Sequence, residues 1–205
     1  GYYKARETSL NKIPMVIART GWSGELSYEL YLQDRKKGDE LFEIVHEAAK
    51  EFNGAVIAPN TIRTIEGGLL SYQSDFGREH NPFTIGLDRL VDLDQDIDFI
   101  GKEALKKIKS EGISEKLVGV EIDGDPIQKV PENFWPVFDE NHKKIGRLSR
   151  CFFSPRLKKN IGLAIIDINF VEPGTPLVIE SPKAHLNAQV HELPWFPAEK
   201  STNLD

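Results

Sequence analysis

Two short segments near the start of the chain have the hydrophobic pattern of β-strands. Residues 13–18 are mostly apolar and β-branched, and a glycine-containing turn follows them. Residues 25–32 then alternate between apolar and polar, which is the period of a strand with one buried face. The apolar face consists of Leu26, Tyr28, Leu30 and Leu32. The pattern therefore predicts that Glu29 and Tyr31 are neighbours on the opposite face of this strand, away from the core.

The next segment has the spacing of an amphipathic helix. Between positions 39 and 52 the apolar residues recur every three or four positions, and charged residues fill the other side. The apolar positions are Leu41, Phe42, Val45, Ala48, Ala49 and Phe52. Residues 55–57 are expected to be a short buried run, and Pro59 suits the first turn of a further helix that continues toward Leu69. Strand, helix, strand and helix in this order predict an α/β layer.

The second half of the chain has a different pattern of apolar and turn-forming residues. A short basic helix is expected over residues 102–109, and after it the chain breaks into brief strand-like runs separated by glycine, proline, aspartate and asparagine. These runs are residues 117–122, 136–138, 144–148, 161–166, 176–179 and 188–192. We therefore predict an α+β protein with two domains, a mixed α/β region over residues 1–114 and an antiparallel β-barrel over residues 115–205.

Composition and charge narrow the classes of function. The 205 residues are 40% hydrophobic and 28% charged, which is ordinary globular usage. The first 100 residues carry 11 basic and 17 acidic side chains, so the whole net charge of −6 lies there. This charge balance disfavours a nucleic-acid partner. No apolar run approaches the roughly 20 residues that cross a bilayer, so we expect no membrane partner either and a cytoplasmic location.

The residues that usually bind metals or form disulfides are sparse. The five histidines lack the close pair spacing of metal ligands, so no metal site is predicted. An aspartate-rich stretch, residues 92–98, has acidic spacing like that of a calcium loop, but Ile97 stands where such a loop needs glycine, and a solvated acidic loop is favoured. The single cysteine, Cys151, cannot form an internal disulfide and is expected in the core.

An ordered series of motifs resembles the folate-dependent aminomethyltransferase family, whose type member is the T-protein of the glycine cleavage system. The first motif is Arg19-Thr20-Gly21-Trp22-Ser23-Gly24-Glu25, followed by Tyr28-Glu29. Later matches are residues 65–69, Asn81-Pro82, residues 99–105, and Ser154-Pro155 with Asn160. Because the series covers nearly the whole chain, it is far more specific than any one of its motifs.

The resemblance implies tetrahydrofolate as cofactor and a pterin-binding role for Glu29. A pterin presents an exocyclic amine and a ring N–H side by side, and one carboxylate can accept both. Members of the family also carry an N-terminal portion that includes an aspartate at the reacting centre. The chain is therefore interpreted as a C-terminal fragment that is inactive by itself, and no catalytic residue is assigned. The alternative for Glu29 is an ordinary solvated residue of the sheet surface.

Two aromatic residues decide between branches of the family. Trp22 stands where the T-protein usually has tyrosine, and Trp22 and Tyr31 could together hold a methylated cation against their ring faces. Together with the stretch at residues 65–72, this similarity favours the dimethylsulfoniopropionate demethylase branch, in which a small-molecule sulfonium gives a methyl group to tetrahydrofolate. The alternatives are a glycine-cleavage aminomethyltransferase, the end of a dimethylglycine or sarcosine dehydrogenase, and a non-catalytic folate-binding module. Both rings could also serve only to pack the sheet.

Several charged residues receive a structural interpretation. Arg63 departs from the T-protein pattern, and its spacing predicts a local ion pair with Glu66 on the same helix. Arg150, Arg156, Lys158 and Lys159 form a basic cluster on the barrel. This cluster is expected to face solvent, with the polyanionic tail of a folate as the alternative.

Overall fold

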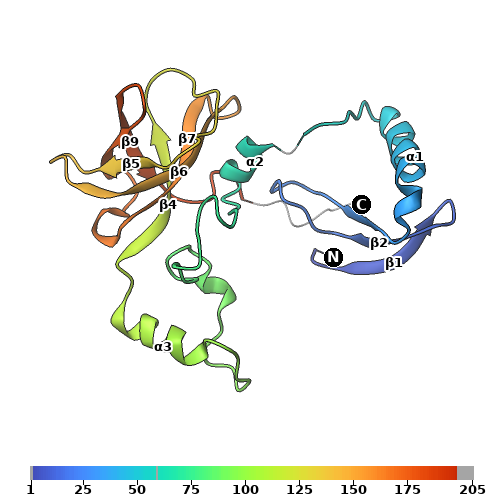
Figure 1. The fold of residues 1–205 in the computed structure, drawn as a ribbon, viewed down its shortest axis with the longest axis horizontal. Helices are drawn as coiled ribbons and strands as arrows, with labels where there is room; N and C mark the ends of the chain where they lie inside the picture. The colour runs from blue at the N-terminus through green and yellow to red at the C-terminus, as the bar shows by residue number, and fades with distance from the viewer. Residues whose placement is uncertain (1, 59, 198–205) are drawn as a thin grey trace. The chain divides into compact units, whose positions relative to one another are not determined.

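A computed structural model describes residues 2–58 and 60–197 of the chain. The Cα trace divides into two compact units, the first ending at Arg63 and including Pro197, the second spanning Thr64–Phe196 (Figure 1). Each unit is described by itself below. The boundary expected between residues 114 and 115 stays a prediction.

The first unit contains a three-stranded antiparallel sheet with the order β1-β2-β3. Its strands are β1 (Ala5–Leu10), β2 (Ile13–Ala18) and β3 (Glu29–Leu32). β2 was predicted and is confirmed, whereas β1 was missed because all six of its residues are exposed and carry no pattern of burial.

The strand predicted over residues 25–32 is wrong in its first half. Only residues 29–32 pair with β2, and Leu26 and Tyr28 are 40% and 51% exposed. Local hydrogen bonds compete with the sheet here, because Ser23 Oγ accepts from the backbone N–H of Glu25 at 3.3 Å and Ser27 Oγ donates to the carbonyl of Glu25 at 2.9 Å. These bonds fold residues 23–27 into a loop.

A single long helix packs on the sheet of the first unit. It is α1 (Gly38–Lys50), which follows the short 3-10 helix η1 (Arg35–Lys37) and confirms the predicted amphipathic helix. Leu41 of α1 packs against Ile13 and Met15 of β2 to form the small core of this unit.

The connection after α1 differs from the prediction. Val56 and Ile57 are 65% and 79% exposed, so the expected buried run at residues 55–57 is wrong. A short apolar run becomes buried only when other elements cover it, and its own sequence does not show whether they do. The next helix, α2 (Thr61–Glu66), begins behind Asn60, whose side chain accepts from the backbone N–H of Ile62 at 2.9 Å. Pro59, predicted to start this helix, lies outside the described residues.

The second unit is built around a closed antiparallel barrel, which confirms the predicted fold class. The strands pair in the order β4-β7-β6-β5-β8-β9. Figure 1 shows this part of the chain in yellow-green to red. The strands are β4 (Glu115–Ile122), β5 (Trp135–Phe138), β6 (Lys144–Ser154), β7 (Lys159–Asp167), β8 (Pro176–Glu180) and β9 (His185–His191). Before the barrel come η2 (Asp88–Leu90) and the predicted basic helix α3 (Lys102–Glu111), and η3 (Ile168–Phe170) follows β7.

Alternation along β7 supplies two separate cores. Ala164 and Ile166 point into the barrel with Val120 and Leu148, while Ile161, Leu163 and Ile165 pack outside it against Ile65 of α2. Because β7 is covered on both faces, every residue from Asn160 to Ile166 is buried. The outer core fixes the end of α2 to the barrel.

Candidate functional site

The register of the small sheet separates two faces with different surroundings. Met15 lies opposite Leu32, and both belong to the side that contacts α1. Because successive side chains in a strand point to opposite faces, Glu29 and Tyr31 of β3 leave the sheet on the other side. The predicted placement of Glu29 and Tyr31 away from the core is thereby confirmed.

The carboxylate of Glu29 is held by two hydroxyl groups. The Tyr31 hydroxyl donates to Glu29 Oε2 at 3.1 Å, and the Thr20 hydroxyl donates to the same oxygen. The hydrogen bond to Glu29, together with the carboxylate's negative charge, raises the pKa of Tyr31. Sequence reasoning missed Thr20, although its place inside the Arg-Thr-Gly motif was a signal.

The second oxygen of this carboxylate retains its capacity to bind a ligand. An ionised carboxylate offers about four acceptor positions, and Thr20 and Tyr31 use two of them, both on Oε2. Within residues 2–58 and 60–197, no hydrogen bond to Glu29 Oε1 is found. Glu29 is therefore oriented through one oxygen and can accept a ligand N–H through the other.

Trp22 lies in the loop that precedes β3. Its side chain is 53% exposed and that of Tyr31 is 54% exposed, so both rings are accessible. Among the described residues, no ring contact joins these two aromatic side chains. The predicted arrangement, in which the two rings border one methyl donor, stays a prediction.

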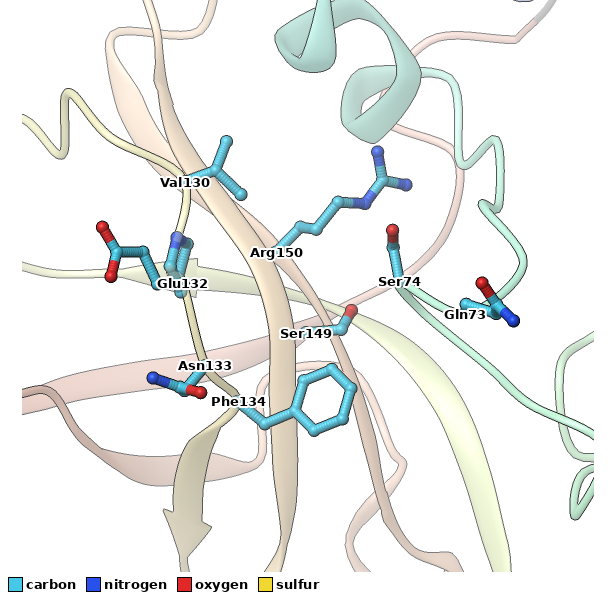
Figure 2. A pocket seen from close by; sticks show the side chains of 9 residues that line it. Gln73, Ser74, Val130, Glu132, Asn133, Phe134, Ser149 and Arg150 are labelled. Carbon is cyan, nitrogen blue, oxygen red and sulfur yellow. The ribbon is translucent and has the colours of Figure 1, made fainter.

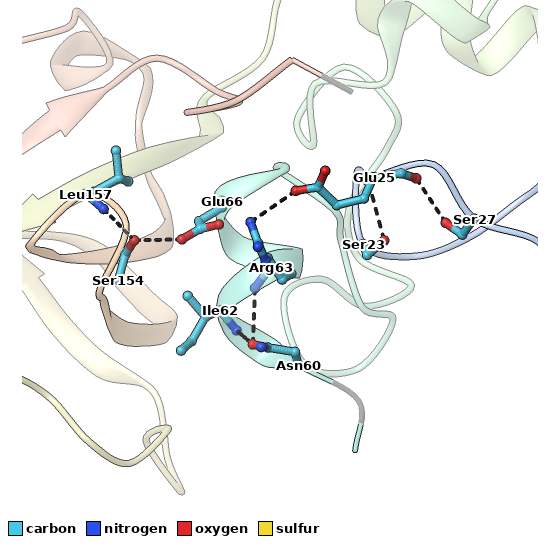
Figure 3. A network of polar contacts seen from close by, with 9 residues as sticks. All are labelled: Ser23, Glu25, Ser27, Asn60, Ile62, Arg63, Glu66, Ser154 and Leu157. Atoms are coloured by element: carbon cyan, nitrogen blue, oxygen red, sulfur yellow. Dashed lines mark hydrogen bonds and ion pairs between the residues drawn. The ribbon is translucent and has the colours of Figure 1, made fainter. Parts of the chain in front are cut away.

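Several contacts fix the conformation of the loop that follows Trp22. Figure 3 shows those of Ser23, Glu25 and Ser27. Arg63 Nη1 donates to Glu25 Oε1 at 3.0 Å, which joins the loop to the beginning of α2, within the first unit. Gly21 is required by close packing, because a Cβ atom there would overlap Ser27 Oγ and lie 2.6 Å from Ser27 Cβ. The sequence did not indicate the Arg63–Glu25 ion pair, which spans 38 residues. The predicted pairing of Arg63 with Glu66 stays a prediction.

Two of the later motifs meet in the second unit (Figure 3). Ser154 Oγ donates to Glu66 Oε1 at 2.6 Å and accepts from the backbone N–H of Leu157 at 3.0 Å. Glu66 is 3% exposed, so this contact is buried. The motif at residues 65–69 and the Ser154-Pro155 motif therefore connect α2 to the end of β6.

The basic cluster on the barrel was expected to face solvent, and for Arg150 this is wrong. Arg150 is 7% exposed and pairs side-on with Asp75, through Nε to Oδ1 at 2.8 Å and Nη2 to Oδ2 at 2.6 Å. Ser149 Oγ also donates to Asp75 Oδ1 at 2.7 Å. A buried guanidinium requires such a partner, and this one lies 75 residues away in the sequence.

The other basic residues near Arg150 have separate environments. The guanidinium of Arg156 lies 3.8 Å from the centre of the Phe196 ring. Lys158 is exposed, and Lys159 forms an ion pair with Glu121 at 2.6 Å. Arg156, Lys158 and Lys159 are exposed, so the expectation that the cluster faces solvent is confirmed for these three residues.

Beside Arg150 the second unit has a half-open pocket of about 300 Å³ (Figure 2). One wall is the loop at residues 130–134, and the other includes Gln73 and Ser74. The Phe134 ring lines the pocket and has Arg147 stacked at 4.6 Å from its centre. Nothing in the sequence pattern indicated this pocket.

Two further groups bear on metal binding. Asp92 accepts from the backbone N–H groups of Asp94 and Gln95, and Lys102 donates to backbone carbonyls of the same acidic stretch. The acidic stretch is therefore organised by hydrogen bonds of its own neighbourhood.

On α1, the ligand atoms of Glu43, His46 and Glu47 lie within 4.8 Å of one another. They belong to a partly exposed helix surface on which Glu47 already pairs with Lys50. The expectation of no metal site stays a prediction.

Cys151 lies in the barrel core, as predicted. It is fully buried, and burial raises the pKa of its thiol to about 12. The thiol is therefore protonated at neutral pH and is not a nucleophile.

A helix with the length and hydrophobicity of a membrane span is not found in the part of the chain that the structure describes.

Comparison with known proteins places the fold first. The crystal structure of glycine cleavage system aminomethyltransferase T from Bartonella henselae superposes with a TM-score of 0.79 at 20% sequence identity. The match covers 90% of this chain and 50% of that one. The architecture is therefore that of the T-protein fold, a mixed helix and sheet region followed by a closed barrel.

Sequence comparison then identifies the family. The GCVT N-terminal domain family matches residues 1–95, and the glycine cleavage T-protein C-terminal barrel domain family matches residues 115–197. An aminomethyltransferase of a Geobacillus species is 35% identical over 198 residues. The dimethylsulfoniopropionate demethylase DmdA of Ruegeria pomeroyi is 26% identical over 196 residues. The chain belongs to the glycine cleavage T-protein family.

The extent of these matches is also a finding. Each of these two relatives is matched along 95% of this chain but 52% of its own length. The chain thus spans about half the length of the curated relatives that it matches. Most of these relatives are named aminomethyltransferases, and one is named a demethylase. The comparisons therefore support the family, but they do not favour the demethylase branch over the aminomethyltransferases.

Proposed function

We propose that the chain forms part of a tetrahydrofolate-dependent transferase of the aminomethyltransferase type, in which Glu29 holds the pterin. The observation that carries this proposal is the geometry of the Glu29 carboxylate. One of its oxygens is fixed by Thr20 and Tyr31, and the other has acceptor capacity on the sheet face away from α1.

The chemistry of the carboxylate fits a pterin edge. Bound tetrahydrofolate would supply the nitrogen that takes up the one-carbon group. Glu29 Oε1, which keeps its two acceptor positions, would accept the exocyclic amine and the adjacent ring N–H, two charge-assisted hydrogen bonds that fix the orientation of the ring. The Thr20 and Tyr31 hydroxyls hold the carboxylate in place before the ligand arrives, which reduces the loss of side-chain freedom on binding.

Binding of tetrahydrofolate to the chain and its Glu29→Gln variant tests the proposal. The substitution keeps the shape but removes the negative charge, so the pterin N–H groups lose their charge-assisted acceptor. We expect a cost of about 2–4 kcal/mol, which is roughly 30- to 1000-fold in folate affinity. Isothermal titration calorimetry measures the folate affinity of each variant, and a melting curve measures its thermal stability.

Glu7 provides a matched control, because it lies opposite Val16 on the same sheet face as Glu29 but on the other edge strand. Glu7→Gln should leave folate affinity unchanged. An equal loss in both variants, or no binding by the unmodified chain, would contradict the proposed role of Glu29.

Demethylation of a sulfonium compound is the second candidate, and Trp22 is the residue that favours it. An exposed indole can hold a sulfonium cation on its face, and one relative is named as a dimethylsulfoniopropionate demethylase. If this candidate is correct, dimethylsulfoniopropionate should quench Trp22 fluorescence saturably, and Trp22→Leu should abolish that component. The aminomethyltransferase proposal predicts no saturable quenching.

A further inference from the structure

One edge of the Arg19 guanidinium is buried. Its Nε and Nη2 atoms are shielded from solvent and have no hydrogen-bond partner within residues 2–58 and 60–197. The backbone of Arg19, in contrast, is well bonded, donating to the carbonyl of Lys4 at 2.8 Å and accepting from the N–H of Tyr3 at 3.1 Å. The residue is therefore held in place while one side of its charged group lacks an acceptor.

These two atoms form the edge of an arginine that binds a carboxylate side-on. The same chain shows this geometry at Arg150, whose Nε and Nη2 reach the two oxygens of Asp75 at 2.8 and 2.6 Å. A guanidinium removed from water without such an acceptor is strongly destabilised. The edge of Arg19 thus has the donor pattern of the Arg150 pair, but no carboxylate in the described part of the chain is bound to it.

The position of Arg19 separates this edge from the proposed folate site. Its hydrogen bond to Lys4 continues the β1–β2 ladder by one residue beyond the pair Ala5 and Ala18. By alternation, Arg19 follows Ile17 on the α1 side of the sheet, whereas Glu29 lies opposite Ala18 on the other side. A ligand of Arg19 would therefore approach from the face that Glu29 does not use.

We propose that the Nε–Nη2 edge of Arg19 binds the carboxylate of a small organic acid. A carboxylate presents two oxygens at the spacing of this edge and neutralises its charge. Both nitrogens are shielded from solvent, so the site must open slightly before a ligand enters. A small planar acid needs less opening than a side chain on a folded protein surface, which favours the small acid as the source of the carboxylate.

Nuclear magnetic resonance of the arginine side chains in the full chain tests this site. Sodium acetate is the probe, and sodium chloride at equal ionic strength is the control. We expect acetate, but not chloride, to shift the Arg19 Nε–H signal saturably. Arg19→Lys keeps the charge but removes the two-donor edge, so acetate affinity should fall by about 10- to 100-fold.

Arg6 provides the matched control, because it is an exposed arginine on β1 that lies opposite Ile17. Arg6→Lys should leave the acetate affinity unchanged. If Arg19→Lys does not fold, the acetate titration of the unmodified chain still decides the question. No acetate-specific shift of the Arg19 signal would overturn the proposal.

A second probe distinguishes the two sources of a carboxylate. A short peptide with blocked ends and a single glutamate carries the same group on a polypeptide. The small-acid assignment predicts that acetate binds more tightly than this peptide. A shift of the Arg19 signal with the peptide but not with acetate would overturn it. Because Glu29 takes no part in this binding, failure here would leave the folate proposal untouched.

Discussion

Glu29 and Tyr31 are coupled through a hydrogen bond whose effect can be measured without any ligand. The carboxylate stabilises the neutral phenol and repels the phenolate, so the pKa of Tyr31 is raised above its ordinary value. This interaction favours the fold below pH of about 10, and its contribution is lost as the pH rises through the raised pKa of Tyr31.

Glu29→Gln should therefore lower the pKa of Tyr31 toward its ordinary value, because the amide removes the negative charge. The measurement is a pH titration of the Tyr31 ring carbon by nuclear magnetic resonance. Glu7→Gln should leave the titration of Tyr31 where it is. An unchanged Tyr31 titration in Glu29→Gln would mean that the hydrogen bond does not persist in solution.

The buried ion pair between Asp75 and Arg150 should be a large contributor to stability when one partner is removed. Asp75→Asn leaves the Arg150 guanidinium buried without a countercharge, and such losses cost about 3–5 kcal/mol. Chemical denaturation measures the change in the free energy of unfolding. Glu103→Gln, which breaks an exposed pair with Lys106, should cost less than about 1 kcal/mol. Similar costs for the two variants would contradict this account.

These residues also show what sequence spacing can reveal. The alternation of β3 was enough to place Glu29 on the face away from α1, because its neighbours in sequence determine that face. The burial of Arg150 depends on Asp75, a partner far away in the chain, so local patterns gave the wrong environment. Thr20 was missed for the same reason, since its bond to Glu29 crosses from the end of β2 to β3.

At the scale of elements, prediction succeeded where burial is periodic. The strand-like runs of the second half all became strands of the barrel, because a closed barrel buries one face of each strand. Prediction failed at β1, whose residues are all exposed, and at residues 55–57, where an apolar run lies in solvent. At residues 55–57 the hydrophobic pattern and the actual burial disagree, whereas β1 has no buried face that a pattern could reveal.

The two-residue turn between β1 and β2 has a strained backbone conformation, and a substitution can test this strain. Its two loop residues, Asn11 and Lys12, have φ angles of 46° and 66°, the left-handed region that a two-residue type I′ turn requires. Asparagine tolerates this region, but lysine does so at a cost that glycine avoids. Lys12→Gly should therefore stabilise the first unit by about 0.5–1 kcal/mol, measured by thermal or chemical denaturation.

Lys50→Gly serves as the control for this substitution. Lys50 ends α1, so glycine there should destabilise the unit by up to about 1 kcal/mol. A destabilising effect of Lys12→Gly would show that the turn does not hold the left-handed conformation in solution.

For the whole molecule, the two compact units differ greatly in the cores that stabilise them. The barrel encloses a large cluster of buried residues, and a second cluster covers its outside. The first unit has a small core of Ile13, Met15 and Leu41, with Leu32 and Ile44 at its margin. Because burial of apolar area is the main stabilising contribution, the two units should not have equal stability.

Native-state hydrogen exchange should resolve this difference strand by strand. The amides of β7 lie between β4 and β6 in a closed barrel, so they exchange only when the barrel opens. β2 is the central strand of its sheet, but its unit has few buried contacts, and local opening there should be less costly. If the opening free energies differ by about 3 kcal/mol, the β7 amides exchange on the order of 100-fold more slowly than those of β2.

The comparison of β2 with β7 is matched, because both are central strands with antiparallel neighbours on each side. Equal protection in the two strands would mean that both units unfold as one cooperative body and would contradict the expected difference in stability.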